Sequence, residues 1–192
     1  MLYMNQLKYK DIIYMHNMQN GGPAEGRNNV ATSGCGLCCA CMMVDALTDK
    51  QLELTECVRL SEDNAANLMP GTDMTVLGPI LAEKFGLTYS NTTSLDKAIA
   101  HLQNGGYIIS HVGHPAEGVP GLFTFRGHYI SLISTDGKEF CILDPSYKEG
   151  KFDIPEREGK INEKNAPFLY CDVNILHGET KGHKYHLFAR KK

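Results

Sequence analysis

The sequence has no excess of charge of either sign. It carries 19 Lys and Arg residues against 22 Asp and Glu residues, for a formal net charge of −3 at pH 7. Proteins that bind nucleic acids or anionic membranes by electrostatic attraction concentrate basic side chains on one surface. The one short basic segment, Arg190-Lys191-Lys192, is typical of a solvated chain end. We therefore expect no nucleic-acid partner.

Long apolar runs are also missing. No segment approaches the ~20 apolar residues that a membrane-spanning helix needs, so no membrane insertion is expected. The first residues, Met1 to Gln6, lack the charged and apolar regions of a signal peptide. These absences predict a cytoplasmic protein, whereas removal of an earlier leader would make it a secreted one.

The cysteines do not suit a disulfide framework. There are seven of them, an odd number, and four fall between Cys35 and Cys41. Such a set is typical of a reducing compartment. With the exception of Cys35, the cysteines are expected to act as small buried hydrophobic residues.

The residue pattern changes half-way along the chain. Helical periodicity and capping residues predict four helices, at about 36–47, 49–60, 76–85 and 94–104. From Gly106 onward, β-branched and aromatic residues predict strands at 107–112, 128–133, 140–144, 168–175 and 184–189. Helices followed by an antiparallel sheet form the α+β pattern. With 42% apolar residues and no repeat or linker, the whole chain 1–192 is expected to form one domain.

One cysteine stands at a helix start. Ser33-Gly34-Cys35-Gly36 leads directly into the apolar run from Leu37 to Val44. This helix is apolar on nearly all sides and is therefore expected to be buried. The helix dipole and the unpaired N–H groups of the first turn stabilise a thiolate, and lower its pKa below the free value of about 8.5. Cys35 is thus the candidate nucleophile.

Two later segments supply a candidate base and a residue to orient it. They are His128, in Gly127-His128-Tyr129-Ile130, and Asp144, in Ile142-Leu143-Asp144-Pro145. The order Cys, His, Asp along the chain is the order that papain-like cysteine hydrolases use.

The hairpin between these segments tests whether they can meet. A three-residue loop, 135–137, pairs Ser134 with Lys138 and is favoured by the glycine at its third position. That register sets His128 directly opposite Asp144, on the same face, with Cβ atoms roughly 5 Å apart. A two-residue loop would instead direct Asp144 to the other face of the sheet. We therefore predict the three-residue loop.

In this geometry the three residues can carry out nucleophilic catalysis. Asp144 orients the imidazole, His128 takes the proton from Cys35, and the thiolate attacks a carbonyl to form an acyl-thioester. The backbone N–H of Cys35 supplies one oxyanion donor, and the amide side chain of Gln19 or Asn29 supplies a second. Gln19 is the preferred candidate because its longer side chain can reach from a separate loop.

These motifs together resemble those of the bacteriocin-processing (double-glycine leader) cysteine peptidases, and in particular the stand-alone bacterial branch of that family within the papain superfamily. The segment at Cys35 resembles the nucleophile motif, residues 123–130 the histidine motif and residues 143–146 the aspartate motif. The upstream residues 14–19 resemble the segment that carries the family's glutamine. The resemblance covers about residues 14–147.

The resemblance implies a papain-like fold, in which a buried helix with the nucleophile at its N-terminus packs on a C-terminal antiparallel sheet. It also implies hydrolysis of peptide bonds, a peptide or small-protein substrate, and no cofactor. Leu37 and Cys38 follow the Cys-Gly pair where the family usually has proline and a small hydroxyl residue. We interpret this as a local variation. Neither the cleavage specificity nor the oligomeric state follows from the sequence.

The spacing of the cysteine cluster also matches two other kinds of site, an iron–sulfur centre and a redox-active cysteine pair. Cys35, Cys38 and Cys41 form a C-x2-C-x2-C pattern that can nucleate an iron–sulfur cluster. Inside a helix these side chains point away from one another and no fourth ligand follows, so we expect no metal site. A thioredoxin-like C-x-x-C would require a preceding strand, but a turn-rich loop precedes Cys35.

Two further alternatives keep the three catalytic candidates. An acyltransferase or transglutaminase-type enzyme would pass the acyl group to an amine instead of water. A catalytically idle relative would only bind peptides, although the intact triad argues against it.

The remaining histidines carry no catalytic signal. His111 and His114 are expected in a solvated loop, with the wall of a cleft as the alternative. His177, His183 and His186 lie near the C-terminus and are expected at the surface.

Overall fold

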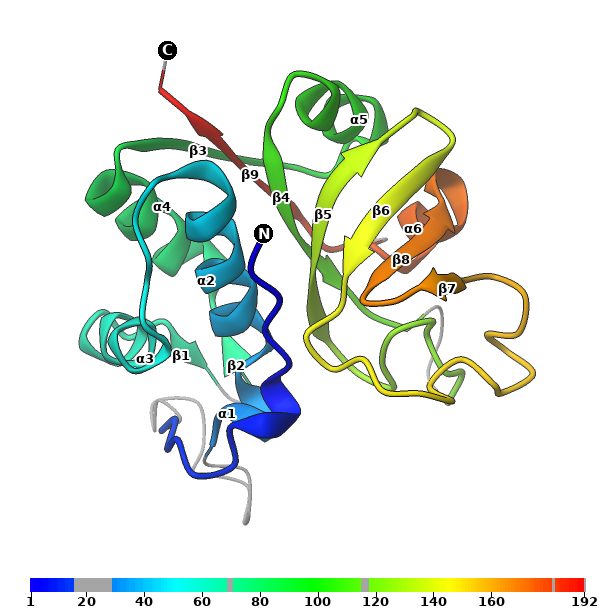
Figure 1. Ribbon diagram of the computed structural model, residues 1–192, viewed down its shortest axis with the longest axis horizontal. Coiled ribbons are helices and arrows are strands. Elements are labelled where there is room, and N and C mark those ends of the chain that lie inside the picture. The colour runs from blue at the N-terminus through cyan, green and yellow to red at the C-terminus, as the bar shows by residue number, and fades with distance from the viewer. Residues whose placement is uncertain (16–28, 69–70, 115–117, 181, 192) are drawn as a thin grey trace.

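The computed structural model describes residues 1–15, 29–68, 71–114, 118–180 and 182–191. Seven strands of these residues form one antiparallel sheet, which crosses the molecule between two groups of helices (Figure 1). In spatial order the strands are β3 (Leu87–Thr92), β9 (Tyr185–Arg190), β4 (Tyr107–Val112), β5 (His128–Thr135), β6 (Glu139–Leu143), β8 (Phe168–Asp172) and β7 (Asn162–Asn165).

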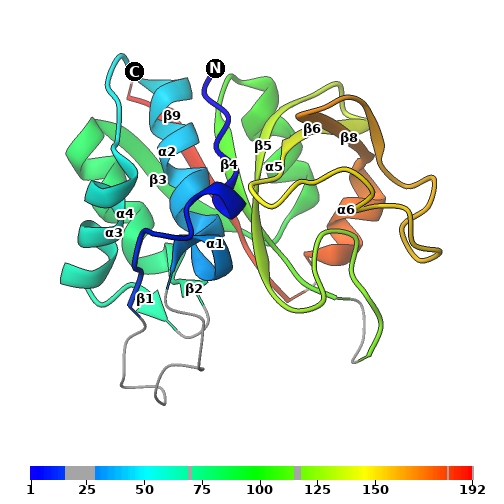
Figure 2. The same ribbon diagram turned by 60° about the horizontal axis from the view of Figure 1, so that its bottom comes forward.

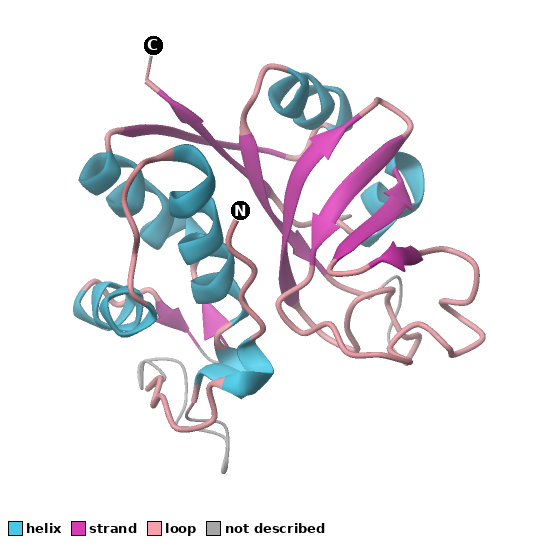
Figure 3. Cartoon of the chain, viewed as in Figure 1, coloured by secondary structure: helices cyan, strands magenta, loops and turns pink. Residues whose placement is uncertain are grey.

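The helices cover both faces of this sheet (Figure 3). One group consists of α2 (Cys35–Leu47), α3 (Leu54–Asp63) and α4 (Met74–Phe85), and the other of α5 (Leu95–Gln103) and α6 (Val173–Glu179). Alternate residues of β4 join the two cores: Ile109 packs with α2, and Ile108 packs with α5. The α+β pattern predicted from the sequence is confirmed.

Short elements complete the described chain. They are η1 (Gln6–Lys8), α1 (Val30–Ser33) and the two-stranded pair β1 (Asn67–Leu68) and β2 (Gly71–Thr72). None of the helices in the described residues combines the length and apolar character that crossing a bilayer requires.

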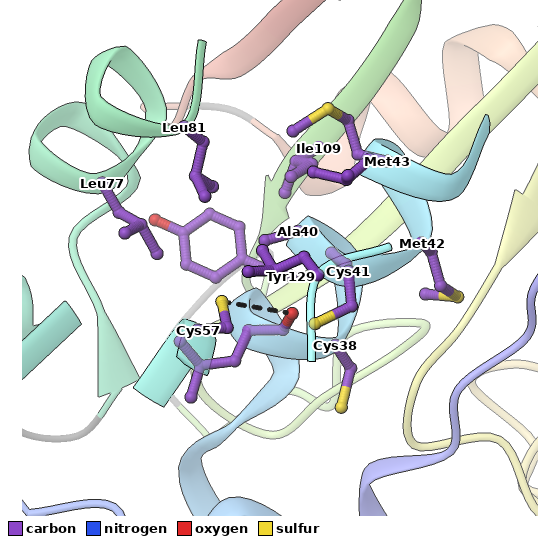
Figure 4. Packing of buried hydrophobic residues seen from close by; sticks show 14 of the residues in the cluster. Cys38, Ala40, Cys41, Met42, Met43, Cys57, Leu77, Leu81, Ile109 and Tyr129 are labelled. Carbon is purple, nitrogen blue, oxygen red and sulfur yellow. Dashed lines mark hydrogen bonds between the residues drawn. The ribbon is translucent and has the colours of Figure 1, made fainter. Parts of the chain in front are cut away.

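The central helix α2 is buried on nearly all sides, as its sequence predicts (Figure 4). Its side chains contact Leu77 and Leu81 of α4 and Tyr129 of β5 within one apolar core. Cys57 of α3 lies against the helix, and its thiol donates a 3.8 Å hydrogen bond to the carbonyl of Leu37. Because a fully packed helix cannot rotate or slide without opening cavities, its first residue is held in a fixed position.

Two helix boundaries differ from the prediction. The second helix begins at Leu54 rather than Asp49 and continues to Asp63, past the predicted end at Leu60. The third begins at Met74 because Asp73 acts as the N-cap, accepting a hydrogen bond from the N–H of Thr75. Pro79 therefore lies in the second turn and not in the first. The fourth helix starts after Ser94, as predicted.

The five predicted strands are all present, but one of them ends early, and strands β3 and β7 of the sheet were not predicted. Strand β3 was not predicted, since only Leu87 of its residues is fully buried and the strand shows no regular apolar alternation. The predicted strand 168–175 ends at Asp172, whose carboxylate accepts hydrogen bonds from the N–H groups of Asn174 and Ile175. This cap starts helix α6 in place of the last three strand residues.

The hairpin of β5 and β6 does not have the predicted register. Thr135 pairs with Phe140, so the connection is longer than three residues, although Gly137 is left-handed as expected with φ 89°. Beyond a β-bulge between Leu132 and Ser134, Ser131 pairs with Leu143. Direct opposition of His128 and Asp144 is therefore wrong.

The bulge nevertheless places both residues on one face. Continuing the register from Ser131–Leu143 puts Asp144 opposite Ile130, two residues from His128 and hence on the same face. Without the extra residue, the pairing near the turn would put Asp144 opposite Ser131, and His128 would then face the other side of the sheet.

Candidate active site

Cys35 lies where two helices meet. Helix α1 ends at Ser33, and Gly34 is both its C-cap and the N-cap of α2. A Cβ atom on Gly34 would lie 2.5 Å from the Val30 side chain, and one on Gly36 would lie 3.2 Å from the Tyr129 ring. The two glycines thus allow the tight turn and close packing that present Cys35, which is partly exposed, at the helix start.

His128 and Asp144 are in direct contact. The Nε2 atom of the His128 ring lies 2.8 Å from Oδ1 of Asp144 and 3.1 Å from the hydroxyl of Ser146. Both partners are removed from water, with 6% of His128 and none of Asp144 exposed. Because Nε2 faces the carboxylate, the other ring nitrogen is left for the thiol of Cys35, with which the imidazole also interacts.

The pKa values of this pair shift toward each other. Burial alone would raise the pKa of the Cys35 thiol, but the hydrogen bond and charge of His128, with the backbone N–H groups of Tyr129 and Gly36, lower it below its usual value. Burial would lower the pKa of His128, but the charge and hydrogen bond of Asp144, with Cys35, raise it. Opposite shifts of this kind favour a thiolate–imidazolium pair.

The neighbouring cysteines of α2 behave differently. Burial raises the pKa of both Cys38 and Cys39 well above the usual thiol value. These thiols are inert packing groups, as the sequence predicts, whereas Cys35 has the electrostatic surroundings of a nucleophile.

A buried lysine, Lys151, completes the group, and no sequence pattern predicted its position there. The ammonium of Lys151 forms an ion pair with Oδ2 of Asp144 and a 2.7 Å hydrogen bond to the Ser146 hydroxyl. Burial would raise the pKa of Asp144, but Lys151 first and His128 second hold it well below its usual range. Burial lowers the pKa of Lys151 despite the attraction of Asp144. A lysine in a turn-rich segment is ordinarily expected in solvent, which explains why the sequence analysis did not include Lys151.

The N-terminal segment secures the Asp144 loop. The Tyr3 hydroxyl donates a 2.8 Å hydrogen bond to the carbonyl of Asp144, and the N–H of Gln6 donates a 2.7 Å bond to the carbonyl of Pro145. The Asn5 side chain donates to the carbonyl of Tyr147. Figures 1 and 2 show this segment running alongside α2, on the side of the helix that faces β5.

Only one of the two candidates for the second oxyanion donor, Asn29, is among the described residues. Gln19 lies outside the described residues. Asn29 is the N-cap of α1, where its side-chain oxygen accepts a 3.1 Å hydrogen bond from the N–H of Thr32. This cap gives Asn29 a structural role at the start of the short helix that precedes Cys35.

The described residues do not support the iron–sulfur alternative. No group of three or more His, Cys, Asp or Glu side chains within them could hold a metal ion. All seven cysteines are unpaired.

A cavity of about 620 Å³ opens beside Cys35 and His128. Its walls come from the β1–β2 region, with Leu68 and Thr72, and from β4 and the segment before β5. His111 and His114 line this cavity. This supports the alternative prediction, that they form the wall of a cleft, and not the prediction of a solvated loop. His183 also lines it.

One of the three C-terminal histidines is not at the surface. His186 is 2% exposed, because it lies in β9 between β3 and β4, and its Nδ1 lies 2.9 Å from the Tyr89 hydroxyl.

The fold is similar to that of a known structure. Among the solved chains that match is a "putative C39-like peptidase from Bacillus anthracis", with a TM-score of 0.53, 8% sequence identity, and coverage of 95% of this chain and 96% of that chain. At this identity the likeness is one of fold, which is α+β and papain-like. A scan against models of protein families and a search of curated proteins find no match.

The pairing of Asp144 with Lys151 and His128 predicts a specific loss of stability in acid. Because its folded-state pKa is depressed, its ionised form contributes stability that is complete above the unfolded value near 3.8 and is lost as the pH falls below it. Asp144→Asn should be less stable than the wild type at neutral pH, and the difference should shrink below about pH 4. Thermal unfolding measured across this range checks the prediction. The control Asp11→Asn, at an exposed site, should unfold at the same temperature as the wild type at each pH. A stability deficit of Asp144→Asn that stays the same at every pH would contradict the prediction.

Breaking the buried Lys151–Asp144 ion pair should lower the free energy of unfolding far more than breaking an exposed ion pair. Lys151→Met keeps the apolar stem but leaves the Asp144 carboxylate buried with one charged partner fewer, which should cost about 3 kcal/mol. The matched control is Lys84→Met, which breaks the 3.0 Å pair with Glu56 at a site where the lysine is 40% exposed, and should cost less than about 1 kcal/mol. Urea unfolding measures both, and equal losses would refute the distinction.

Proposed function

We propose that this protein is a cysteine peptidase whose catalytic residues are Cys35, His128 and Asp144, and that residues 1–192 form a single peptidase domain. The observation that carries the proposal is the arrangement of Cys35 at the start of a buried helix, next to an imidazole whose far nitrogen bonds to a buried carboxylate. A thiol, a base and an orienting acid in this geometry form an activated nucleophile. The papain-like fold is consistent with it.

The first half of the reaction forms an acyl-enzyme. The Cys35 thiolate attacks the carbonyl carbon of the scissile peptide bond, and the carbonyl electron pair moves onto oxygen. The tetrahedral intermediate then expels the amine, which takes the proton held by the His128 imidazolium. The products of this half are a thioester on Cys35, a free amine and a neutral His128.

The second half uses water. Neutral His128 removes a proton from a water molecule, whose oxygen forms a bond to the thioester carbon. The C–S bond breaks, the carboxylic acid leaves, and Cys35 and His128 return to the thiolate–imidazolium pair. Together the two halves consume one water molecule for each peptide bond cleaved.

Lys151 supports both halves as a positioning residue. The charge of His128 changes during each turnover, whereas Lys151 remains paired with Asp144 throughout. Asp144 therefore keeps a cationic partner when the imidazole is neutral, and its carboxylate can remain ionised and aligned with Nε2. Ser146, whose hydroxyl lies within hydrogen-bond distance of all three residues, further limits their movement.

The oxyanion would be stabilised by the N–H of Cys35 and by a side-chain amide. We retain Gln19 for the second donor, because Asn29 already caps α1. Seven unpaired cysteines suit a reducing compartment, so we propose a cytoplasmic location. We also propose that the substrate is a peptide or a small protein, and that no cofactor takes part.

The direct test is cleavage of a mixed peptide library, with new chain ends identified by mass spectrometry. The wild type should generate new N- and C-termini, and Cys35→Ala should lower the rate at least ~10³-fold. Cys38→Ala, three residues further along the same helix, is the matched control and should retain activity.

The same experiment in H₂¹⁸O separates hydrolysis from acyl transfer. Hydrolysis places one ¹⁸O atom in each new C-terminal carboxylate, whereas an acyltransferase would yield amide-linked products without label. If the wild type forms neither new termini nor an acyl-enzyme on Cys35, the proposal is contradicted and an idle peptide-binding relative is favoured.

A further inference from the structure

The cavity beside Cys35 has an unbalanced charge. Among its described lining residues, Arg126 carries the one permanent charge, and no aspartate or glutamate is present. Arg126 is exposed and takes part in none of the ion pairs found within the described residues. It lies two residues before His128, so its charge is at the edge of the reaction centre.

Closely packed rings form the wall next to Arg126: His111 is stacked on Tyr129 and tilted against His183. The ring centroids of His183 and His111 are 4.1 Å apart, and those of His111 and Tyr129 are 4.7 Å apart. Glycines permit this approach: a Cβ atom on Gly127 would lie 2.9 Å from Nε2 of His111, and one on Gly113 would lie 2.7 Å from Nε2 of His183. The rings therefore lie directly against the backbone that carries Arg126.

The two imidazoles of this wall are neutral at neutral pH. Burial, then the charge of His183, lowers the pKa of His111 to about 4, and burial also lowers the pKa of His183. A neutral imidazole offers one N–H donor and a flat face, and it does not need a buried counter-ion.

Nearby carboxylates are engaged elsewhere. Glu179, which interacts electrostatically with His114, accepts a 2.8 Å hydrogen bond from the N–H of Leu122. Asp73, next to Thr72, caps helix α4. Neither is among the described lining residues, so no carboxylate of the described lining offsets the positive potential of Arg126.

We propose that this cavity is a specificity site for an acidic side chain of the substrate, a glutamate or aspartate close to the scissile bond. The inference rests on the proposed peptidase function. The carboxylate pairs with Arg126, and the body of the side chain lies against the rings of His111 and His183. A lysine or arginine in the same place would meet Arg126 with no carboxylate among the described lining residues to balance it. Charge complementarity at the edge of an interface gives selectivity of this kind.

The test is the residue preference around the cleavage sites in a proteome-derived peptide library. The wild type should cleave sites with Glu or Asp at one fixed position within a few residues of the scissile bond, about tenfold more often than matched sites with Gln or Asn. Arg126→Gln should abolish this preference, and Arg126→Glu should reverse it toward Lys and Arg. The control Arg59→Glu makes the same charge change at an exposed position of α3 that does not line the cavity, and should keep the wild-type preference.

The outcomes separate this inference from the proposed function. Cleavage by the wild type without an acidic preference, or an acidic preference that survives in Arg126→Glu, overturns the specificity site and leaves the peptidase function standing. Absence of cleavage by the wild type overturns both. Loss of the acidic preference in Arg126→Gln and its reversal in Arg126→Glu, with Arg59→Glu unchanged, establish the site.

Discussion

The contact between His128 and Asp144 depends on one extra residue in strand β5. Side chains alternate between the faces of a strand, so the number of residues between the hairpin turn and His128 decides which core its ring faces. The bulge between Leu132 and Ser134 adds one residue and brings the imidazole to the face on which Asp144 lies. The remaining features of the site bring a thiol and a cation to that pair.

The buried charges of the site balance in two pairs. Asp144 is paired with Lys151, and Cys35 interacts with His128, whose hydrogen bond and charge lower the pKa of the thiol. A buried carboxylate with a single titrating partner would lose its counter-charge whenever the imidazole is neutral, at a large desolvation cost. With Lys151 present, Asp144 can stay ionised in each state of His128. The N-terminal segment fixes this loop through the backbone carbonyls of Asp144 and Pro145. Residues far apart in the sequence therefore determine the electrostatics at Cys35.

The sequence predicted the parts of the site that depend on local pattern. An apolar run directly after Gly-Cys-Gly predicted a buried helix with Cys35 at its start. The shared face of His128 and Asp144 was predicted from a three-residue loop at 135–137; the shared face was right but the loop was wrong, because a longer connection is offset by the bulge. The exact register was wrong by two residues, because a bulge has no distinct signature in a run of β-branched residues. The burial of Lys151 could not be predicted, since it depends on how the turn after Asp144 folds back over that carboxylate and against the ring of Phe123. His186 was likewise expected at the surface, because nothing local indicates that its strand lies between β3 and β4.

We propose that His128 keeps Cys35 ionised, and the pH dependence of Cys35 alkylation tests this role. Iodoacetamide modification is followed residue by residue with mass spectrometry, in the wild type and in His128→Ala. At ~pH 5.5, about three units below the free thiol value of ~8.5, Cys35 of the wild type should still react fast, while Cys35 of His128→Ala should react only as the pH approaches that value. Equal rates for the two proteins above ~pH 9 would show that the reagent reaches Cys35 in both. A wild-type Cys35 that also loses its reactivity in mild acid, or one that is unaffected by His128→Ala, would contradict the account.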